Sequence, residues 1–128
     1  MRAQSVNKYL SALNCAYTIL GYSDGYSGKI DTLDKPVEGY MVSIYSLGIF
    51  PNLSEVRIFD MVPILRNYCD SYSIPDELYI GSWRNPDNKE VHFEVSVNLL
   101  TLDEAILLGK EYNQKYIYDV VNKCNIKL

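Results

Sequence analysis

Residues 91–98 constrain the fold of this chain more than any other segment, because apolar and polar residues alternate there without a break. Successive side chains of a strand point to opposite faces of a sheet, so the pattern predicts a strand with one apolar and one polar face. The apolar face consists of Val91, Phe93, Val95 and Val97, and the polar face consists of His92, Glu94, Ser96 and Asn98. One side of this strand therefore belongs to a core, and the other can contact a ligand.

A helix and a second strand follow directly. Thr101 with Glu104 three residues later forms a capping box, which predicts a helix that ends near residues 113–115. Residues 116–119 then favour a strand, and a turn near Asn122 and Lys123 predicts a closing hairpin. The last third of the chain thus has the order strand, capped helix, strand.

The first half of the chain contains two further helices and several short strands. Helical spacing of apolar residues predicts a helix over residues 6–20, with Ser5 as its N-cap and Gly21 as its stop. Strands are expected at residues 29–33, 40–46 and 55–59. Asp60 is expected to cap a second helix that has Pro63 in its first turn and fades by residue 72.

Residues 78–84 are expected to pair with residues 91–98, because the turn-rich segment 85–89 separates them. A turn centred near Asp87 and Asn88 places Trp83 opposite His92. In this register Leu78 and Ile80 join the apolar face, and Tyr79 and Trp83 join the polar face.

About three helices and seven short strands alternate without the regularity of a doubly wound fold. The class expected is α+β, with the helices packed on short, mostly antiparallel strands. A length of 128 residues suits one hydrophobic core, and no linker divides the chain, so we expect a single domain over residues 1–128.

Composition excludes several functions. A net charge of −4 argues against binding to long nucleic acids, which requires a clustered basic surface. No apolar run has the length of a signal peptide or a membrane helix, so we expect a cytoplasmic protein without a membrane partner. Cys15, Cys69 and Cys124 fit neither a disulfide framework nor a metal motif and are expected to be reduced thiols.

The polar face of the predicted hairpin is the best candidate binding surface. Tyr79 and Trp83 flank Gly81, so a planar ring can lie against the sheet between two aromatic side chains. Glu94 or Asn98 can then hydrogen-bond the edge of that ring. The alternative is that a helix or a second subunit covers this face and that Tyr79 and Trp83 are packing residues.

Three cations are candidates for contact with a phosphate. Arg57 lies in a predicted strand, Arg84 follows Trp83 at the mouth of the hairpin, and Lys115 follows the last helix. The guanidinium group can donate two parallel hydrogen bonds to a phosphate. The alternatives are surface ion pairs with Glu55 or Asp87 and, for Lys115, a favourable position near a helix C-terminus.

Catalysis and metal binding have little support. His92 is the only histidine, and no ligand spacing for zinc or calcium is present. The glycine-containing loop 21–29 lacks the pattern of a phosphate-binding loop. We therefore expect no catalytic residues, no metal and no cofactor.

Three short motifs carry a resemblance to a known family. They are H-F-E-V-S-V-N-L at residues 92–99, L-x-E-A-x-x-L-G-K at residues 102–110 and N-Q-K-x-I-Y-D at residues 113–119. This ending is similar to that of small phage and prophage proteins, and within these the chain resembles the first-type Thoeris anti-defence family. The resemblance covers mainly residues 78–128.

The resemblance implies a phage anti-defence protein that evades immunity by sequestration. It would bind cyclic ADP-ribose isomers, the signals made by bacterial TIR-domain immune enzymes, and would not cleave them. Homodimers or larger assemblies are implied, with pockets shared between protomers. The implied ligand contacts are Trp83, Asn98, Arg57 and Lys115, although lysine at position 115 weakens bidentate phosphate contact relative to arginine.

Two other functions remain open. The twelve tyrosines suit a protein interface as well as a nucleotide pocket, which favours an acidic inhibitor of a bacterial immune nuclease, similar in role to anti-CRISPR proteins. The third function is an enzyme that acts on nucleotides. Release of an intact ligand on denaturation would indicate sequestration, and release of a cleaved product would indicate an enzyme. Capture of a nuclease would indicate the inhibitor.

Overall fold

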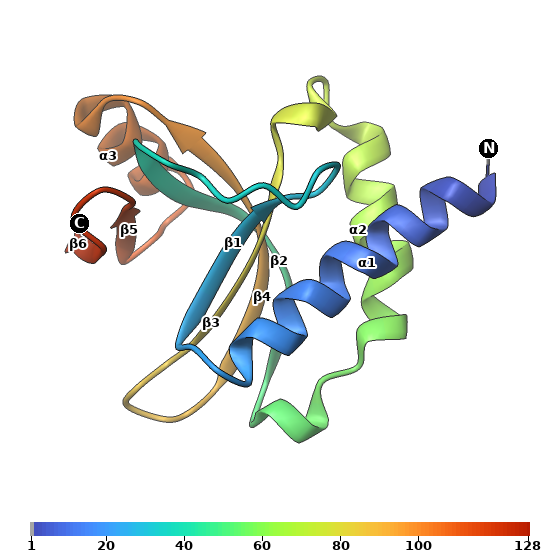
Figure 1. The fold of residues 1–128 in the computed structure, drawn as a ribbon. Coiled ribbons are helices and arrows are strands. Elements are labelled where there is room, and N and C mark those ends of the chain that lie inside the picture. Colours follow the sequence, from blue (N-terminus) through green and yellow to red (C-terminus); the bar gives the residue numbers. More distant parts are fainter. Residues whose placement is uncertain (1) are drawn as a thin grey trace.

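The computed structural model describes the backbone of residues 2–128 and the side chains of residues 8–75 and 77–128. Figure 1 shows a single α+β domain in which three helices pack on one curled antiparallel sheet. The helices are α1 (Arg2–Leu20), α2 (Ile58–Ser71) and α3 (Leu102–Glu111). The strands are β1 (Gly25–Lys29), β2 (Tyr40–Phe50), β3 (Tyr79–Arg84), β4 (Val91–Leu99), β5 (Tyr116–Asp119) and β6 (Cys124–Lys127). Their order in the sheet is β1-β3-β4-β2-β5-β6.

The predicted hairpin is confirmed in its register. Trp83 pairs with His92, and Ile80 pairs with Val95, as the turn position required. The apolar residues of β4 lie on one side of the sheet, where Val91, Phe93 and Val95 have no exposed surface. A slip of one residue would expose these side chains to water, which is why the alternation fixes the register.

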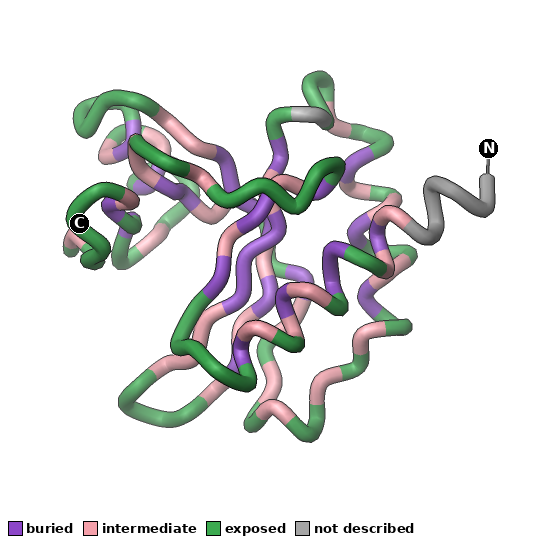
Figure 2. Tube along the Cα trace, in the orientation of Figure 1, coloured by how far each residue is buried: buried purple, intermediate pink, exposed green. Residues whose placement is uncertain are grey.

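Helices α1 and α2 cover the apolar side of the central strands (Figure 1). The buried hydroxyl of Ser82 in β3 donates a hydrogen bond to Ala16 O of α1 at 3.0 Å. On α2, Met61, Leu65 and Cys69 are buried at a spacing of four residues and form its inward face. Figure 2 shows the buried positions concentrated between these helices and the central strands.

Helix α3 packs on the same side of the sheet, near β5 and β6. Its Thr101 Oγ1 accepts a hydrogen bond from Glu104 N at 3.3 Å and donates one to Glu104 Oε1 at 2.7 Å, so the predicted cap is confirmed. A Cβ on Gly109 would lie 3.1 Å from Ile117 Cγ2, which shows how closely α3 approaches β5. The register from β5 through β2 to β4 places Ile117 on the side of Val97 and Val95.

Strand β2 is longer than the predicted strand 40–46 and contains two irregularities. Its pairing with β4 shifts between Ser43 and Tyr45 and again between Ser46 and Gly48. Each shift places an extra residue in β2, and such bulges bend a strand and increase its twist. Gly48 therefore lies within β2, which continues to Phe50, beyond the predicted end at residue 46.

Several boundaries predicted from the sequence are wrong. The strand expected at residues 29–33 lies at Gly25–Lys29, and the strand expected at 55–59 does not form, because a 3₁₀ turn at Leu53–Glu55 leads into α2 at Ile58. The described sheet therefore has six strands, one fewer than expected. Helix α1 begins at Arg2, so Ser5 lies inside the helix; its side chain is outside the described residues.

The start of α2 also differs from prediction. Arg57 occupies the N-cap position and makes no capping hydrogen bond with its side chain, while Asp60 lies in the first turn. A carboxylate in that turn still interacts favourably with the positive end of the helix dipole. Pro63 lies inside the helix, beyond the first turn where it was expected.

Candidate functional site

The candidate site is the side of the sheet opposite the three helices, which we call the helix-free face. Side chains alternate between the two faces of a strand, so every second residue of β1, β3, β4 and the start of β2 lies on this face. Its central members are Lys29, Met41, Ser43, Tyr79, Gly81, Trp83, His92, Glu94, Ser96 and Asn98. No helix of the described chain packs on this side, so the predicted alternative of a covering helix does not apply within one protomer.

Trp83 and His92 form a stacked pair on this face. Their ring centroids lie 4.2 Å apart with 15° between the planes, so His92 already occupies one side of the indole. His92 Nε2 is buried without a hydrogen-bond partner and lies 3.8 Å from Glu90 Oε1. Burial lowers the pKa of His92, and the nearby Glu90 carboxylate opposes this effect. The imidazole therefore favours its neutral form and offers an unused polar atom.

Glu94 lies beside this pair. Burial raises the pKa of the Glu94 carboxyl, and interactions with the side chains of Ser43 and Trp83 partly counter that rise. Gly81 faces Glu94 across the hairpin, and a Cβ there would lie 3.6 Å from both Glu94 Cγ and Ser96 Oγ. The sequence predicted that Gly81 leaves room for a planar ring, and in the structure the side chains of Glu94 and Ser96 lie next to that space.

The raised pKa of Glu94 predicts a dependence of stability on pH. A carboxyl whose pKa is higher in the folded chain than its ordinary value of 4.5 disfavours folding as the pH rises through that range, because ionisation is easier in the unfolded chain. Glu94→Gln removes the ionisation, so this variant should gain stability relative to the natural chain as the pH rises above the ordinary carboxyl pKa of 4.5. Urea unfolding at a series of pH values measures the difference.

The control for this prediction is Glu111→Gln, because Glu111 is exposed at the end of α3. Its stability difference from the natural chain should vary little over the same pH range. A Glu94→Gln difference that stays constant with pH would show that the Glu94 carboxyl is solvated in the folded protein.

Two of the predicted contact residues have structural roles. Arg84 Nη2 donates a hydrogen bond to Leu20 O at 3.0 Å and so holds the C-terminal end of α1, on the helix side of the sheet. Asn98 Nδ2 donates to Glu38 O at 2.9 Å and ties the segment before β2 to β4. Arg84 makes no ion pair with Asp87. Its hydrogen bond to Leu20 O holds the guanidinium group on the helix side of the sheet, away from the surface where the phosphate contact was predicted.

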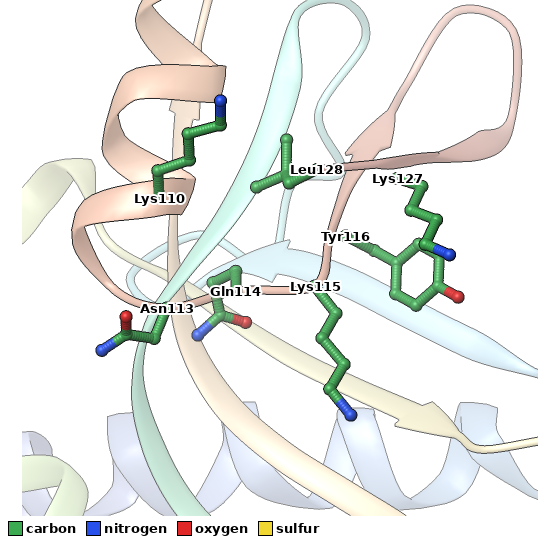
Figure 3. Close-up of a pocket in the computed structure, with 7 residues that line it drawn as sticks. All are labelled: Lys110, Asn113, Gln114, Lys115, Tyr116, Lys127 and Leu128. Atoms are coloured by element: carbon green, nitrogen blue, oxygen red, sulfur yellow. The ribbon is translucent and has the colours of Figure 1, made fainter.

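The other two predicted cations lie apart from the helix-free face. Arg57 is exposed at the N-terminus of α2. Lys115 is exposed at the start of β5, where it lines an open hollow of about 650 Å³ together with Lys110 and Lys127 (Figure 3). The structure therefore brings Tyr79, Trp83, His92 and Glu94 together and separates them from all three predicted cations.

The sequence prediction missed Lys29 and Ser43. Lys29 pairs with Tyr79, which makes it the lysine of β1 on the helix-free face, and Ser43 pairs with Ser96. Lys29 was missed because the first strand was placed four residues too late. Ser43 was predicted to lie in a strand, but only the sheet order shows that this strand is next to β4.

Groups of three or more histidine, cysteine, aspartate or glutamate side chains that could hold a metal ion are absent from the described part of the chain. Cys69 is buried in α2, on the other side of the sheet from His92. All three cysteines are free thiols, as predicted.

Comparisons with known proteins leave the family open. No protein-family model, no curated protein and no solved structure matches this chain. In the part of the chain that the structure describes, no helix combines the length and the apolar character needed to span a bilayer.

Proposed function

We propose that this protein binds a small nucleotide of the cyclic ADP-ribose class on the helix-free face and sequesters it without cleavage. The observation that carries the proposal is the stacked Trp83–His92 pair beside the desolvated Glu94 carboxyl. An adenine ring needs an aromatic surface and a polar group at its edge. Both are present on a side of the sheet that no described helix covers.

Each group has a defined role in this proposal. The side of the indole that faces away from His92 stacks on the base, and Glu94 hydrogen-bonds the base edge. Lys29, which pairs with Tyr79, replaces Arg84 as the cation on this face of the sheet.

The biological setting of the proposal follows from the resemblance in the last third of the chain. The protein would act in the cytoplasm of a bacterial host as a phage-encoded anti-defence protein and would remove the signal made by TIR-domain immune enzymes. We propose a homodimer or higher homo-oligomer as the active form. Its mass in solution, measured by light scattering, tests this part separately.

Thermal unfolding with a panel of cyclic ADP-ribose isomers tests the binding proposal. A ligand that binds only the folded state raises the midpoint in proportion to the logarithm of its concentration. Heat denaturation of the complex should then release the ligand unchanged. The absence of a shift with every isomer contradicts the proposal, and recovery of a cleaved product identifies an enzyme.

Trp83→Ala should weaken binding of the isomer by about 1–3 kcal/mol, because it removes the stacking surface. Isothermal titration measures the loss, and circular dichroism confirms that the fold is kept. Tyr22→Ala is the matched control, since Tyr22 is 89% exposed in the loop after α1. Equal affinities for the Trp83→Ala and natural proteins would remove Trp83 from the site.

The second candidate is an acidic inhibitor that binds an immune nuclease. It is favoured by the exposed apolar and aromatic side chains at the margins of the helix-free face, such as Ile49 (54% exposed), Tyr116 (50%) and Tyr118 (38%). Tyrosines are enriched in protein interfaces. Co-purification with a nuclease complex, without a thermal shift by any nucleotide, would favour this candidate.

A further inference from the structure

The end of the molecule formed by α3, β5 and β6 contains an open hollow of about 650 Å³. Lys110 of α3, Lys115 just before β5 and Lys127 of β6 line it (Figure 3). The rest of the lining is Asn113, Gln114, Tyr116 and Leu128, the last residue of the sequence. No acidic side chain is present in the described lining. Three lysines and no acidic side chain in the described lining are a local excess of positive charge in a chain of net charge −4.

These lysines have no structural partner that accounts for their position. None of the three takes part in an ion pair with any described residue. Backbone donors already bind two carbonyl groups at the C-terminal end of α3, because Asn113 N donates to Lys110 O and Gln114 N donates to Gly109 O. These two carbonyls do not need Lys115 as a hydrogen-bond donor, although its charge still interacts favourably with the negative end of the helix dipole.

We infer that this hollow is a binding site for a polyphosphate anion, with the pyrophosphate group of a nucleotide as the chemical class. Lysine amines act as mobile point charges toward phosphate oxygens. In Figure 3 the three amines point in different directions, so binding of one anion by all three requires their side chains to reorient. The hollow is open to solvent, and its volume of about 650 Å³ exceeds that of one phosphate group.

This inference does not depend on the proposed function. The hollow is at the α3–β5–β6 end of the molecule, whereas Trp83 and His92 lie on β3 and β4. Tyr116 is common to both regions, since it lines the hollow and lies at the margin of the helix-free face. The two sites can therefore be tested with different probes and different variants.

Isothermal titration with sodium pyrophosphate at an ionic strength of about 20 mM tests the inference directly. We expect saturable binding that is stronger than that of orthophosphate. The triple variant Lys110→Gln/Lys115→Gln/Lys127→Gln should bind pyrophosphate at least about tenfold more weakly, because each lysine supplies a charge-assisted hydrogen bond. All three side chains are exposed, so the variant should fold normally.

The control is a change of equal charge elsewhere. Lys89→Gln removes one positive charge from the exposed β3–β4 turn and should change the affinity less than twofold, whereas Lys115→Gln alone should reduce it more. The Trp83→Ala protein should bind pyrophosphate as the natural chain does, which separates this site from the helix-free face. Absence of saturable binding, or equal losses in Lys89→Gln and Lys115→Gln, would overturn the inference.

Discussion

Phe93→Ala should lower the free energy of unfolding by about 3–5 kcal/mol, because the ring is removed from the centre of the core. Phe93 has no exposed surface and packs edge to face against Phe50, with centroids 6.1 Å apart and 86° between the planes. Its loss leaves a cavity under the middle of β4, which the sheet on one side and the helices on the other prevent from closing. Urea unfolding followed by circular dichroism measures the change.

The matched control for Phe93→Ala is Ile49→Ala. Ile49 pairs with His92, so it lies on the helix-free face, and 54% of its surface is exposed. Its removal should change the free energy of unfolding by about 0.5 kcal/mol or less. Similar losses in both variants would show that both faces of the sheet are buried, and the distinction between a core face and a binding face would fail.

Gly39→Ala should destabilise the protein by about 2–3 kcal/mol, because Gly39 has a backbone conformation that alanine rarely adopts. Its φ is 81°, and a Cβ at this position would lie 2.7 Å from Leu99 O. Gly39 O also accepts a hydrogen bond from Val120 N at 3.0 Å, which joins the start of β2 to the end of β5. Thermal unfolding should show a lower midpoint.

Gly25→Ala serves as the control for Gly39→Ala. Gly25 lies in β1, has no positive φ, and a Cβ there would make an ordinary contact 3.4 Å from Ser82 O. We expect a change within about 0.5–1 kcal/mol in either direction, since alanine also reduces the entropy of the unfolded chain. A Gly39→Ala protein as stable as Gly25→Ala would show that the turn before β2 can relax.

The sequence predicted the last third of the fold well because independent local signals agreed there. Alternation over residues 91–98 sets the faces of β4, and the turn-rich segment 85–89 sets its register with β3. The Thr101–Glu104 cap marks the start of α3 at a single residue. Each of these signals depends on residues close together in the chain.

The errors arose where long-range contacts decide the structure. Residues 55–59 have strand propensity, but the inward spacing of Met61, Leu65 and Cys69 extends the helix back to Ile58. Strand β1 contains two glycines and was read as a loop; its pairing with β3 supplies the stability that its residues lack. Local sequence carries no signal for such pairing.

The same limit explains what was missed in the candidate site. The aromatic and acidic members of the site could be predicted because they share one hairpin. Arg84 was misread because its partner, Leu20 O, is 64 residues away in the sequence. Lys29 and Ser43 join the site only through the sheet order, in which β1 and β2 lie on opposite sides of the hairpin.

Mapping of ligand contacts by heteronuclear NMR tests the central claim most directly. Titration of the ¹⁵N-labelled protein with the cyclic ADP-ribose isomer that gives the largest thermal shift should move the Trp83 indole N–H signal and the amide signals of His92 and Glu94, which lie together on the helix-free face. Signals of α1 and α2, on the other side of the sheet, should move little. An unchanged Trp83 signal at saturating ligand, or shifts confined to α1 and α2, would contradict the account.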